Sequence, residues 1–241
     1  MSMPTTGSPG TSEQVVRWHA FSDAAAFRDA AYAHVVDAAA AAIDQRQQFL
    51  LVLSGGNTPR DLYRALRAAD TDWSRWHIYF GDERCLPCDD PERNSVMAAD
   101  AWLDHVAIPS SQRHVMAAEL GATMAARQYA LDLRGVGEFD LVLLGLGEDG
   151  HTASLFAGHD WGVSKDSADA LAVVDAPKPP LQRVSLSAKR LSRTRAALFL
   201  VAGESKRHAV KAWHANADIP AASIRPPTGV DVLLDASLLS R

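Results

Sequence analysis

Short runs of apolar residues alternate along the chain with segments in which apolar positions recur every three or four residues. The runs QFLLVL, ending at Leu53, and FDLVLLGLG, ending at Gly147, are continuous and stop at or just before glycines. Such runs are typical of strands buried on both faces of a parallel sheet. Between them, Leu62 and Leu66 fall at helical spacing behind Pro59, a favoured first helical residue. This alternation predicts an α/β fold with a mainly parallel sheet and helices on both faces.

The other predicted elements continue this alternation of apolar runs and helical segments. We expect Ser22 to cap a first helix that runs to about Gln47, with Phe27, Ala31 and Val35 on one face. Further strands or helices are expected within residues 76–84, 93–103, 120–135, 171–177, 182–193, 197–214 and 230–239. We predict one α/β domain over residues 15–241. Residues 1–14 are rich in Pro, Gly, Ser and Thr, which predicts a flexible tail.

Composition narrows the classes of partner. Hydrophobic residues make up 47% and charged residues 22% of the 241 residues, as in ordinary globular proteins. The net charge of −5 gives no general attraction to nucleic acid or anionic membranes, so an anionic ligand needs a local basic cluster. No apolar run reaches the roughly 20 residues of a membrane span. The start lacks a secretory pattern, and with two cysteines we expect a cytoplasmic protein.

The two cysteines, Cys85 and Cys88, have the spacing C-x-x-C in DERCLPCDD. This spacing suits a redox pair or half of a zinc site. A second C-x-x-C or H-x-x-x-H pair, which a four-ligand zinc site needs, is absent from the sequence. We therefore expect two free thiols in a loop, and no metal.

Three loops that leave predicted strands carry unusual residues, and the first is SGGNTP. Gly55 and Gly56 allow backbone N–H groups to turn toward an anion, and Thr58 adds a hydroxyl donor at a helix start. This arrangement suits a phosphate site without the lysine of an ATP loop, but an ordinary tight turn has the same letters. The sequence leaves both interpretations open.

The second loop is GDER. Arg84 offers a planar cation that suits a carboxylate, a phosphate or a developing oxyanion. Alternatively, Glu83 and Arg84 form a solvated ion pair of little energetic value.

The third loop, GLGEDGH, matches the dinucleotide fingerprint G-x-G-x-x-G at Gly145, Gly147 and Gly150. A dinucleotide site needs an acidic residue at the end of the next strand, about 20 residues on, and the sequence offers none in that context. His151 follows the last glycine, and an imidazole suits proton transfer near neutral pH. Asp149 either orients the ring or caps the turn.

Taken together, SGGNTP, GDER, the NSVM run that starts at Asn94, and GLGEDGHTASLF resemble the 6-phosphogluconolactonase family in order and spacing. The resemblance extends from about residue 15 to the C-terminus. It implies a Rossmann-like α/β domain of the sugar-phosphate isomerase/deaminase type. It also implies hydrolysis of 6-phospho-D-glucono-1,5-lactone to 6-phospho-D-gluconate in the oxidative pentose phosphate pathway, with no cofactor.

The resemblance also implies roles for individual residues. His151 would be the catalytic base, assisted by Asp149. Arg84 would face the lactone, while Arg183 in PPLQRVSLS and Lys206 in AGESK would meet the phosphate. The substrate-binding residues implied in all are Gly55, Gly56, Asn57, Thr58, Asp82, Arg84, Asn94, Arg183 and Lys206. The chain departs from the family pattern at Asn57, where Ser or Thr is usual, and at Ala157, where proline is usual.

Two alternatives are weighed against this function. Glucosamine-6-phosphate deaminases resemble the chain in their G-x-G-x-D-G-H string, but they carry a glutamate where this chain has Phe156. A non-catalytic sugar-phosphate sensor would need a DNA-binding segment, which the roughly 20 residues before the first predicted helix do not supply. Ser154 is not in a G-x-S-x-G context, so a serine nucleophile is not expected. We expect the substrate as the partner of a monomer or weak homo-oligomer, without nucleic acid or membrane.

Overall fold

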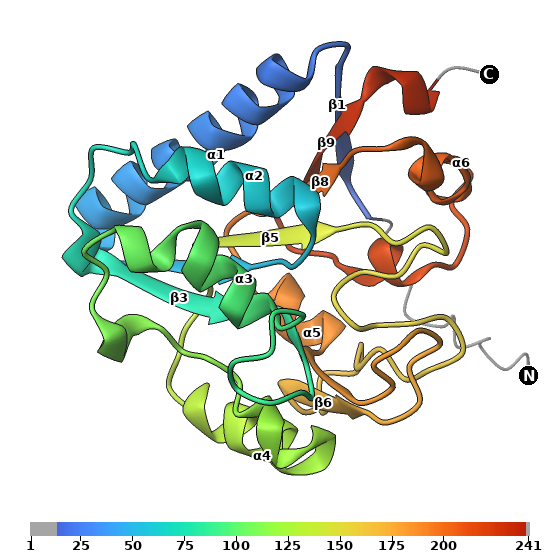
Figure 1. The fold of residues 1–241 in the computed structure, drawn as a ribbon. Coiled ribbons are helices and arrows are strands. Elements are labelled where there is room, and N and C mark those ends of the chain that lie inside the picture. The colour runs from blue at the N-terminus through green and yellow to red at the C-terminus, as the bar shows by residue number, and fades with distance from the viewer. Residues whose placement is uncertain (1–13, 240–241) are drawn as a thin grey trace, which may run out of the picture.

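The protein is built around a six-stranded parallel sheet, seen in a computed structural model that describes residues 14–239 (Figure 1). The strand order across the sheet is β1-β9-β8-β5-β2-β3. In that order the strands span Val16–Phe21, Val230–Asp235, Ala197–Val201, Leu141–Gly145, Phe49–Leu53 and Trp76–Phe80. All neighbouring strands of this sheet pair in parallel, so their carboxyl ends share one edge. The predicted α/β class is confirmed.

Helices cover both faces of the sheet, as predicted. They are α1 (Ala24–Arg46), α2 (Asn57–Leu66), α3 (Asn94–Ala101), α4 (Ala122–Asp132), α5 (Ala188–Ser192) and α6 (Arg207–His214). Trp76 of β3 packs edge-on against Trp102 at the end of α3. Tyr79 points to the other face, where it meets Phe139, and Arg190 of α5 lies over the Phe139 ring. The side chains of β3 thus alternate between the two faces of the sheet and pack toward the helical layer on each face.

A second, antiparallel sheet of three strands flanks the first, in the order β4-β7-β6. Its strands span Asp82–Arg84 (β4), Arg183–Leu186 (β7) and Ala170–Val173 (β6). The GDER segment, predicted as a loop, is therefore a short strand. Pairing with a strand about 100 residues later holds it extended, and it places Arg84 directly opposite Arg183.

Two predicted helix starts are wrong. The cap of α1 is Asp23 rather than Ser22, because the Asp23 carboxylate accepts a hydrogen bond from the Ala26 N–H at 2.9 Å. Pro59 is the third residue of α2 rather than the first, since Gly56 caps that helix with φ of 108°. Proline is tolerated there because the N–H groups of a first helical turn have no partner within the helix.

Strand β1 has no counterpart among the predicted elements. It lies at the sheet edge, where Val16, Trp18 and Phe21 are partly covered and the residues between them are exposed, so it lacks a continuous apolar run. Just before it, the Gln14 side chain donates to the carbonyls of Ala221 and Ile224 and accepts from the Trp213 indole. The rest of the segment predicted as a tail lies outside the described residues.

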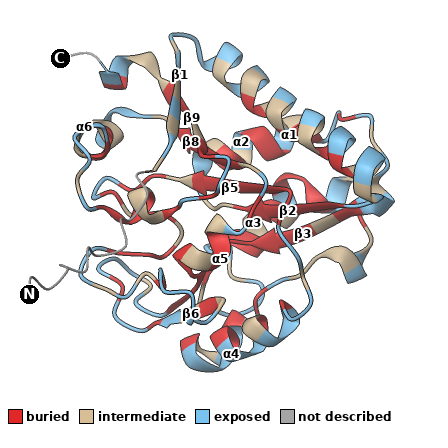
Figure 2. Cartoon of the chain, turned by 180° about the vertical axis from the view of Figure 1, so that it is seen from behind, coloured by how far each residue is buried: buried red, intermediate tan, exposed pale blue. Residues whose placement is uncertain are grey.

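The core runs through both sheets. Buried residues line the strands and the inner sides of the helices, while the outer sides of α1 and α4 are exposed (Figure 2). Val184 and Leu186 of the small sheet belong to the same core as the strands of the large one. Within residues 14–239, no helix has the length and apolar character required to traverse a bilayer.

Candidate active site

A cleft of about 290 Å³ opens at the carboxyl edge of the large sheet, beside β4 and β7. Most residues predicted to bind substrate line it, together with the predicted base. The predicted residues in its walls are Gly55, Gly56, Asp82, Arg84, Asn94, His151, Arg183 and Lys206. Ligands bind at this edge in open α/β sheets because the loops that follow parallel strands converge there.

His151 and Asp149 form a hydrogen-bonded pair. Asp149 Oδ1 lies 2.5 Å from the Nδ1 atom of the His151 ring and also accepts the His151 backbone N–H at 3.2 Å. The carboxylate therefore orients the ring and caps the turn at once, which unites the two roles left open by the sequence. Because an ionised carboxylate only accepts, Nδ1 carries the proton of the neutral ring and Nε2 keeps a lone pair.

The ionisation of Asp149 fits this role. Partial burial raises the pKa of Asp149, but the hydrogen bonds from His151 outweigh it, and the pKa lies below the usual aspartate value. The carboxylate thus stays ionised and available to stabilise a protonated His151 ring.

The glycines of GLGEDG make room for the His151 ring and allow the loop to close around it. A Cβ atom at Gly147 would lie 2.0 Å from His151 Nδ1, so the ring rests directly on this glycine. The Gly147 N–H donates to the His151 carbonyl at 2.7 Å, and Gly150 has φ of 86° with Ile219 packed against it. The loop is thus closed on itself around the histidine, which favours the catalytic interpretation over a dinucleotide site.

Arg183 is held by its own loop. Its side chain is 7% exposed, and its guanidinium donates to the carbonyls of Lys178, Pro179 and Pro180 at 3.1–3.2 Å. Burial lowers the pKa of Arg183, and the neighbouring Arg84 acts in the same direction. Arg84 donates through Nη1 to the Glu92 carbonyl, while its buried Nε has no partner within residues 14–239. Two cations thus face one wall of the cleft.

Asp82 and Asn94, which also line the cleft, form a buried hydrogen-bonded network. The Asn94 amide donates to the Asp82 carboxylate at 3.0 Å, and the Ser154 hydroxyl donates to its other oxygen at 2.6 Å. A Cβ atom at Gly55 would lie 2.0 Å from Asn94 Oδ1, so this glycine makes room for the amide. Ser154 is buried and does not line the cleft, so the geometry does not favour it as a nucleophile.

The idea of a solvated Glu83–Arg84 pair is wrong. Glu83 is fully buried, and its carboxylate accepts the backbone N–H groups of Arg84, Asn94 and Ser95 at 2.7–2.8 Å. Arg93, also buried, lies 3.6 Å from it. Glu83 therefore ties β4 to the start of α3 and fixes Arg84 and Asn94 together. No local spacing signals this contact, because it joins residues 11 or 12 apart across a loop.

The site also involves side chains that were not predicted as site residues, among them those of Phe156, Glu148 and Lys178. Phe156 is 2% exposed, and its ring centre lies 4.8 Å from that of His151 and 5.5 Å from Arg183 Cζ. It supports the base and a cation at once. Glu148 and Lys178 line the cleft and form an ion pair. The contact between Phe156 and His151 lies within one motif, whereas the contact of Phe156 with Arg183 and the Glu148–Lys178 pair each join different segments.

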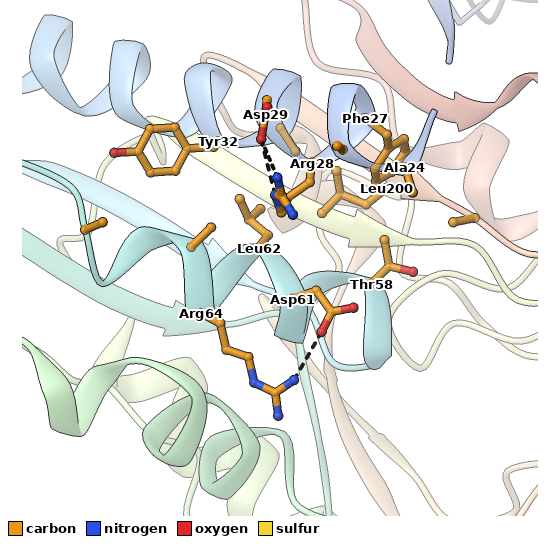
Figure 3. Close-up of a pocket in the computed structure, with 15 residues that line it drawn as sticks. Ala24, Phe27, Arg28, Asp29, Tyr32, Thr58, Asp61, Leu62, Arg64 and Leu200 are labelled. Atoms are coloured by element: carbon orange, nitrogen blue, oxygen red, sulfur yellow. Dashed lines mark hydrogen bonds and ion pairs between the residues drawn. The ribbon is translucent and has the colours of Figure 1, made fainter. Parts of the chain in front are cut away.

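Asn57 and Thr58 do not reach the cleft. The Asn57 side chain accepts from Arg60 at 2.8 Å. Thr58 lines a different and larger hollow of about 860 Å³ between α1 and α2, on a wall shared with Leu62 and Leu200 (Figure 3). The charged side chains there are engaged in the pairs Arg28–Asp29 and Arg64–Asp61. The titratable and cationic groups that suit catalysis therefore gather in the smaller cleft.

Cys85 and Cys88 are both free thiols. Burial raises the pKa of Cys85 to about 11, with the nearby Glu83 carboxylate adding to the effect. Across the described part of the chain, no group of three or more His, Cys, Asp or Glu side chains has the geometry of a metal site.

Comparison with known proteins gives a consistent result. A family model described as "Glucosamine-6-phosphate isomerases/6-phosphogluconolactonase" matches residues 22–233. The 6-phosphogluconolactonase of Mycobacterium tuberculosis is 40% identical over 210 residues, which cover 80% of this chain and 85% of that protein. The corresponding protein of Synechocystis is 39% identical over 207 residues, with coverage of 80% and 85%.

A solved structure shares the fold. The 6-phosphogluconolactonase of Thermotoga maritima superimposes with a TM-score of 0.84 at 24% identity, covering 92% of this chain and 100% of that one.

Proposed function

This chain belongs to the family of glucosamine-6-phosphate isomerases and 6-phosphogluconolactonases, and from that premise we propose that it hydrolyses 6-phospho-D-glucono-1,5-lactone to 6-phospho-D-gluconate. The reaction is a step of the oxidative pentose phosphate pathway. The observation that carries the proposal is the oriented His151–Asp149 pair beside buried Arg183 in one cleft. A general base and a cationic site are the two parts that hydrolysis of a phosphorylated lactone requires.

In the proposed mechanism, His151 Nε2 takes a proton from a water molecule while the oxygen of that water attacks the lactone carbonyl carbon. Asp149 holds the ring and stabilises the imidazolium that forms. Arg84 or loop N–H groups stabilise the tetrahedral oxyanion, a contribution worth about 3 kcal/mol per donor in such sites. The protonated His151 then donates to the departing ring oxygen. The scheme uses no metal and no covalent intermediate.

The phosphate end is assigned to Arg183 and Lys206. A phosphate monoester carries a charge of about −1.5 to −2 near neutral pH, which two cations balance. Gly55 and Gly56 lie in the same cleft before α2, where backbone N–H groups can add donors. These positive groups are concentrated in the cleft, although the chain as a whole has a net charge of −5.

Deamination of glucosamine 6-phosphate is the second candidate, and Phe156 argues against it. The phenyl ring stands where the deaminases carry a glutamate, and it packs against His151. A phenyl ring neither relays a proton nor stabilises an imidazolium as a carboxylate does. A non-catalytic sensor is disfavoured because the His151–Asp149 pair and its supporting glycine form a built catalytic arrangement.

The proposal also covers the cellular compartment, the oligomeric state and the partners of the enzyme. The free and exposed Cys88 thiol is in keeping with a reducing cytoplasm. We propose a monomer or weak homo-oligomer whose partner is the phosphorylated lactone, with no role for nucleic acid or membrane.

The function is tested with purified protein and freshly prepared 6-phosphogluconolactone in a proton-release assay. The wild type is expected to accelerate hydrolysis over the buffer rate, and His151→Ala to lose about 10²- to 10⁴-fold in kcat. His159→Ala is the matched control, because His159 pairs with Asp175 and does not line the cleft. Arg183→Ala should chiefly raise KM. A wild-type rate equal to buffer, or an undiminished rate in His151→Ala, refutes the proposal.

A further inference from the structure

Two oppositely charged side chains meet in the wall of the catalytic cleft. Lys178 Nζ forms an ion pair with Glu148 Oε1, and both residues line the cleft. They come from different loops, since Glu148 lies in the histidine loop after β5 and Lys178 lies between β6 and β7. The two side chains are about half exposed, at 48% for Lys178 and 52% for Glu148. The pair therefore lies where a ligand entering from solvent meets it.

The backbone of Lys178 is fixed by the proposed phosphate-binding arginine. Arg183 Nη2 donates to the Lys178 carbonyl at 3.1 Å. Any ligand group bound by Arg183 is thus close to the base of the Lys178 side chain. Four flexible methylene groups allow the ammonium of a lysine to change partners without movement of the backbone.

Glu148 has a second cation nearby. The hydrogen bond and charge of Lys178 lower the pKa of Glu148 below the usual glutamate value, and the charge of Lys206 adds to this effect. An ionised carboxylate therefore stands near two lysines in a cleft that the proposed function assigns to a phosphate. Lys206 is one of the cations already assigned to that phosphate.

The energetic balance favours exchange of the carboxylate for a phosphate. Exposed lysine–carboxylate pairs contribute little to stability because water and salt screen them. A phosphate monoester brings nearly twice the charge and three acceptor oxygens. The Glu148–Lys178 pair is thus weak enough to break and well placed to be replaced.

We propose that Lys178 is a third cation for the substrate's phosphate, and that Glu148 holds its ammonium group until the phosphate displaces it. This inference rests on the proposed function and assigns a specificity role within the same site. Glu148 acts as an internal anion that competes with weakly charged ligands. Lactones without a phosphate do not displace it and gain nothing from Lys178.

The test measures binding and turnover separately. Affinity for 6-phosphogluconate, the stable product, is measured by calorimetry for the wild type, Lys178→Gln and Glu148→Gln. KM and kcat are measured in parallel with 6-phosphogluconolactone and with unphosphorylated gluconolactone. Lys165→Gln is the matched control, because it removes the same charge from an exposed lysine that does not line the cleft.

Lys178→Gln is expected to weaken 6-phosphogluconate binding and raise KM for the phosphorylated lactone by about tenfold. Its effect on unphosphorylated gluconolactone should be less than twofold. Glu148→Gln is expected to tighten 6-phosphogluconate binding about threefold. The inference is overturned if Lys178→Gln behaves like Lys165→Gln, or if Glu148→Gln leaves binding unchanged or weakens it.

Failure of the function and failure of this inference are distinguishable. A wild type that binds 6-phosphogluconate but does not accelerate lactone hydrolysis refutes the proposed reaction, while the calorimetric comparison still decides the role of Lys178. A wild type with full lactonase activity and an unaffected Lys178→Gln variant refutes only the role of Lys178.

Discussion

At Gly147 the chain has no room for a side chain, and the reason is the histidine four residues later. The letters G-x-G-x-x-G also describe a nucleotide loop, in which glycines admit a pyrophosphate. Here the space above Gly147 is filled by the His151 ring. The proposed chemistry of the loop therefore depends on His151, the residue that follows the pattern and that can be read from the sequence. The close approach of ring and glycine is visible only in the structure.

Gly147→Ala is expected to displace the His151 ring and to lower kcat/KM by about 10²-fold, since a misplacement of about 1 Å is enough for such a loss. Its added Cβ would lie 2.0 Å from Nδ1. Gly137→Ala is the control, because no atom lies within 4 Å of a Cβ at that position. Both variants are compared in the lactone assay and in thermal unfolding. Wild-type turnover in Gly147→Ala would contradict the proposal that the position of the His151 ring against Gly147 is needed for catalysis.

At the scale of elements, burial decides what the sequence predicts. Strands β2, β5 and β8 are covered on both faces, so their apolar runs are continuous and easily recognised. Strand β4 is three polar residues long, and only its pairing with β7 makes it a strand. Strand β1 lies at the sheet edge, where exposed residues interrupt the partly covered ones. Elements held by distant partners carry little local signal, which is why these two were not predicted.

Strand β1 is attached to β9 by an ion pair as well as by its ladder. The Asp231 carboxylate accepts from Arg17 at 2.6 and 2.9 Å and contacts the His19 ring at 2.8 Å. Partial burial raises the pKa of Asp231, but the bonds from Arg17 and His19 outweigh it, so the pKa is lower than usual. A lowered native pKa means that this carboxylate stabilises the fold above its unfolded-state pKa. The contribution is lost as pH falls through the native value.

Asp231→Asn is therefore expected to lower the free energy of unfolding by about 1 kcal/mol at pH 7, as bidentate arginine pairs are worth slightly more than ordinary surface pairs. The difference from the wild type should begin to shrink below about pH 4, where an unfolded aspartate takes up its proton. Urea unfolding across pH measures it. Asp29→Asn, in an exposed pair with Arg28, should have almost no effect. A constant deficit at every pH would refute the electrostatic origin.

For the whole molecule, the sequence predicts the motifs but not how their side chains converge. The ordered motifs place Gly55, Arg84, Asn94, His151 and Arg183 in one site, and all of them line the cleft. Thr58 is only two residues after Gly56 in the sequence, yet it belongs to the other side of α2. The meeting of Lys178 with Glu148, 30 residues apart, depends on how two loops cross the sheet edge. A contact between two loops leaves no periodic pattern in the sequence, so it cannot be predicted from the order of apolar and polar residues.

The small sheet decides whether the molecule unfolds as one unit. Its strands contribute Arg84 and Arg183 to the cleft, and Val184 and Leu186 lie in the same buried core as the large sheet. Glu83 further ties β4 to α3, which packs beside α2. We therefore propose a single cooperative domain over residues 15–241, because separating the two sheets would expose that shared core to water.

Heating or urea should then abolish secondary structure, tryptophan fluorescence and lactonase activity in coincident transitions. Saturating 6-phosphogluconate should shift all three midpoints upward together, by mass action on the folded state, with a gain of about 2.7 kcal/mol at a hundredfold excess over Kd. Glu83→Gln, which weakens the tie between β4 and α3, is expected to lower the common midpoint rather than to split it. Activity lost well before the far-ultraviolet signal would instead show that the small sheet and its arginines unfold separately.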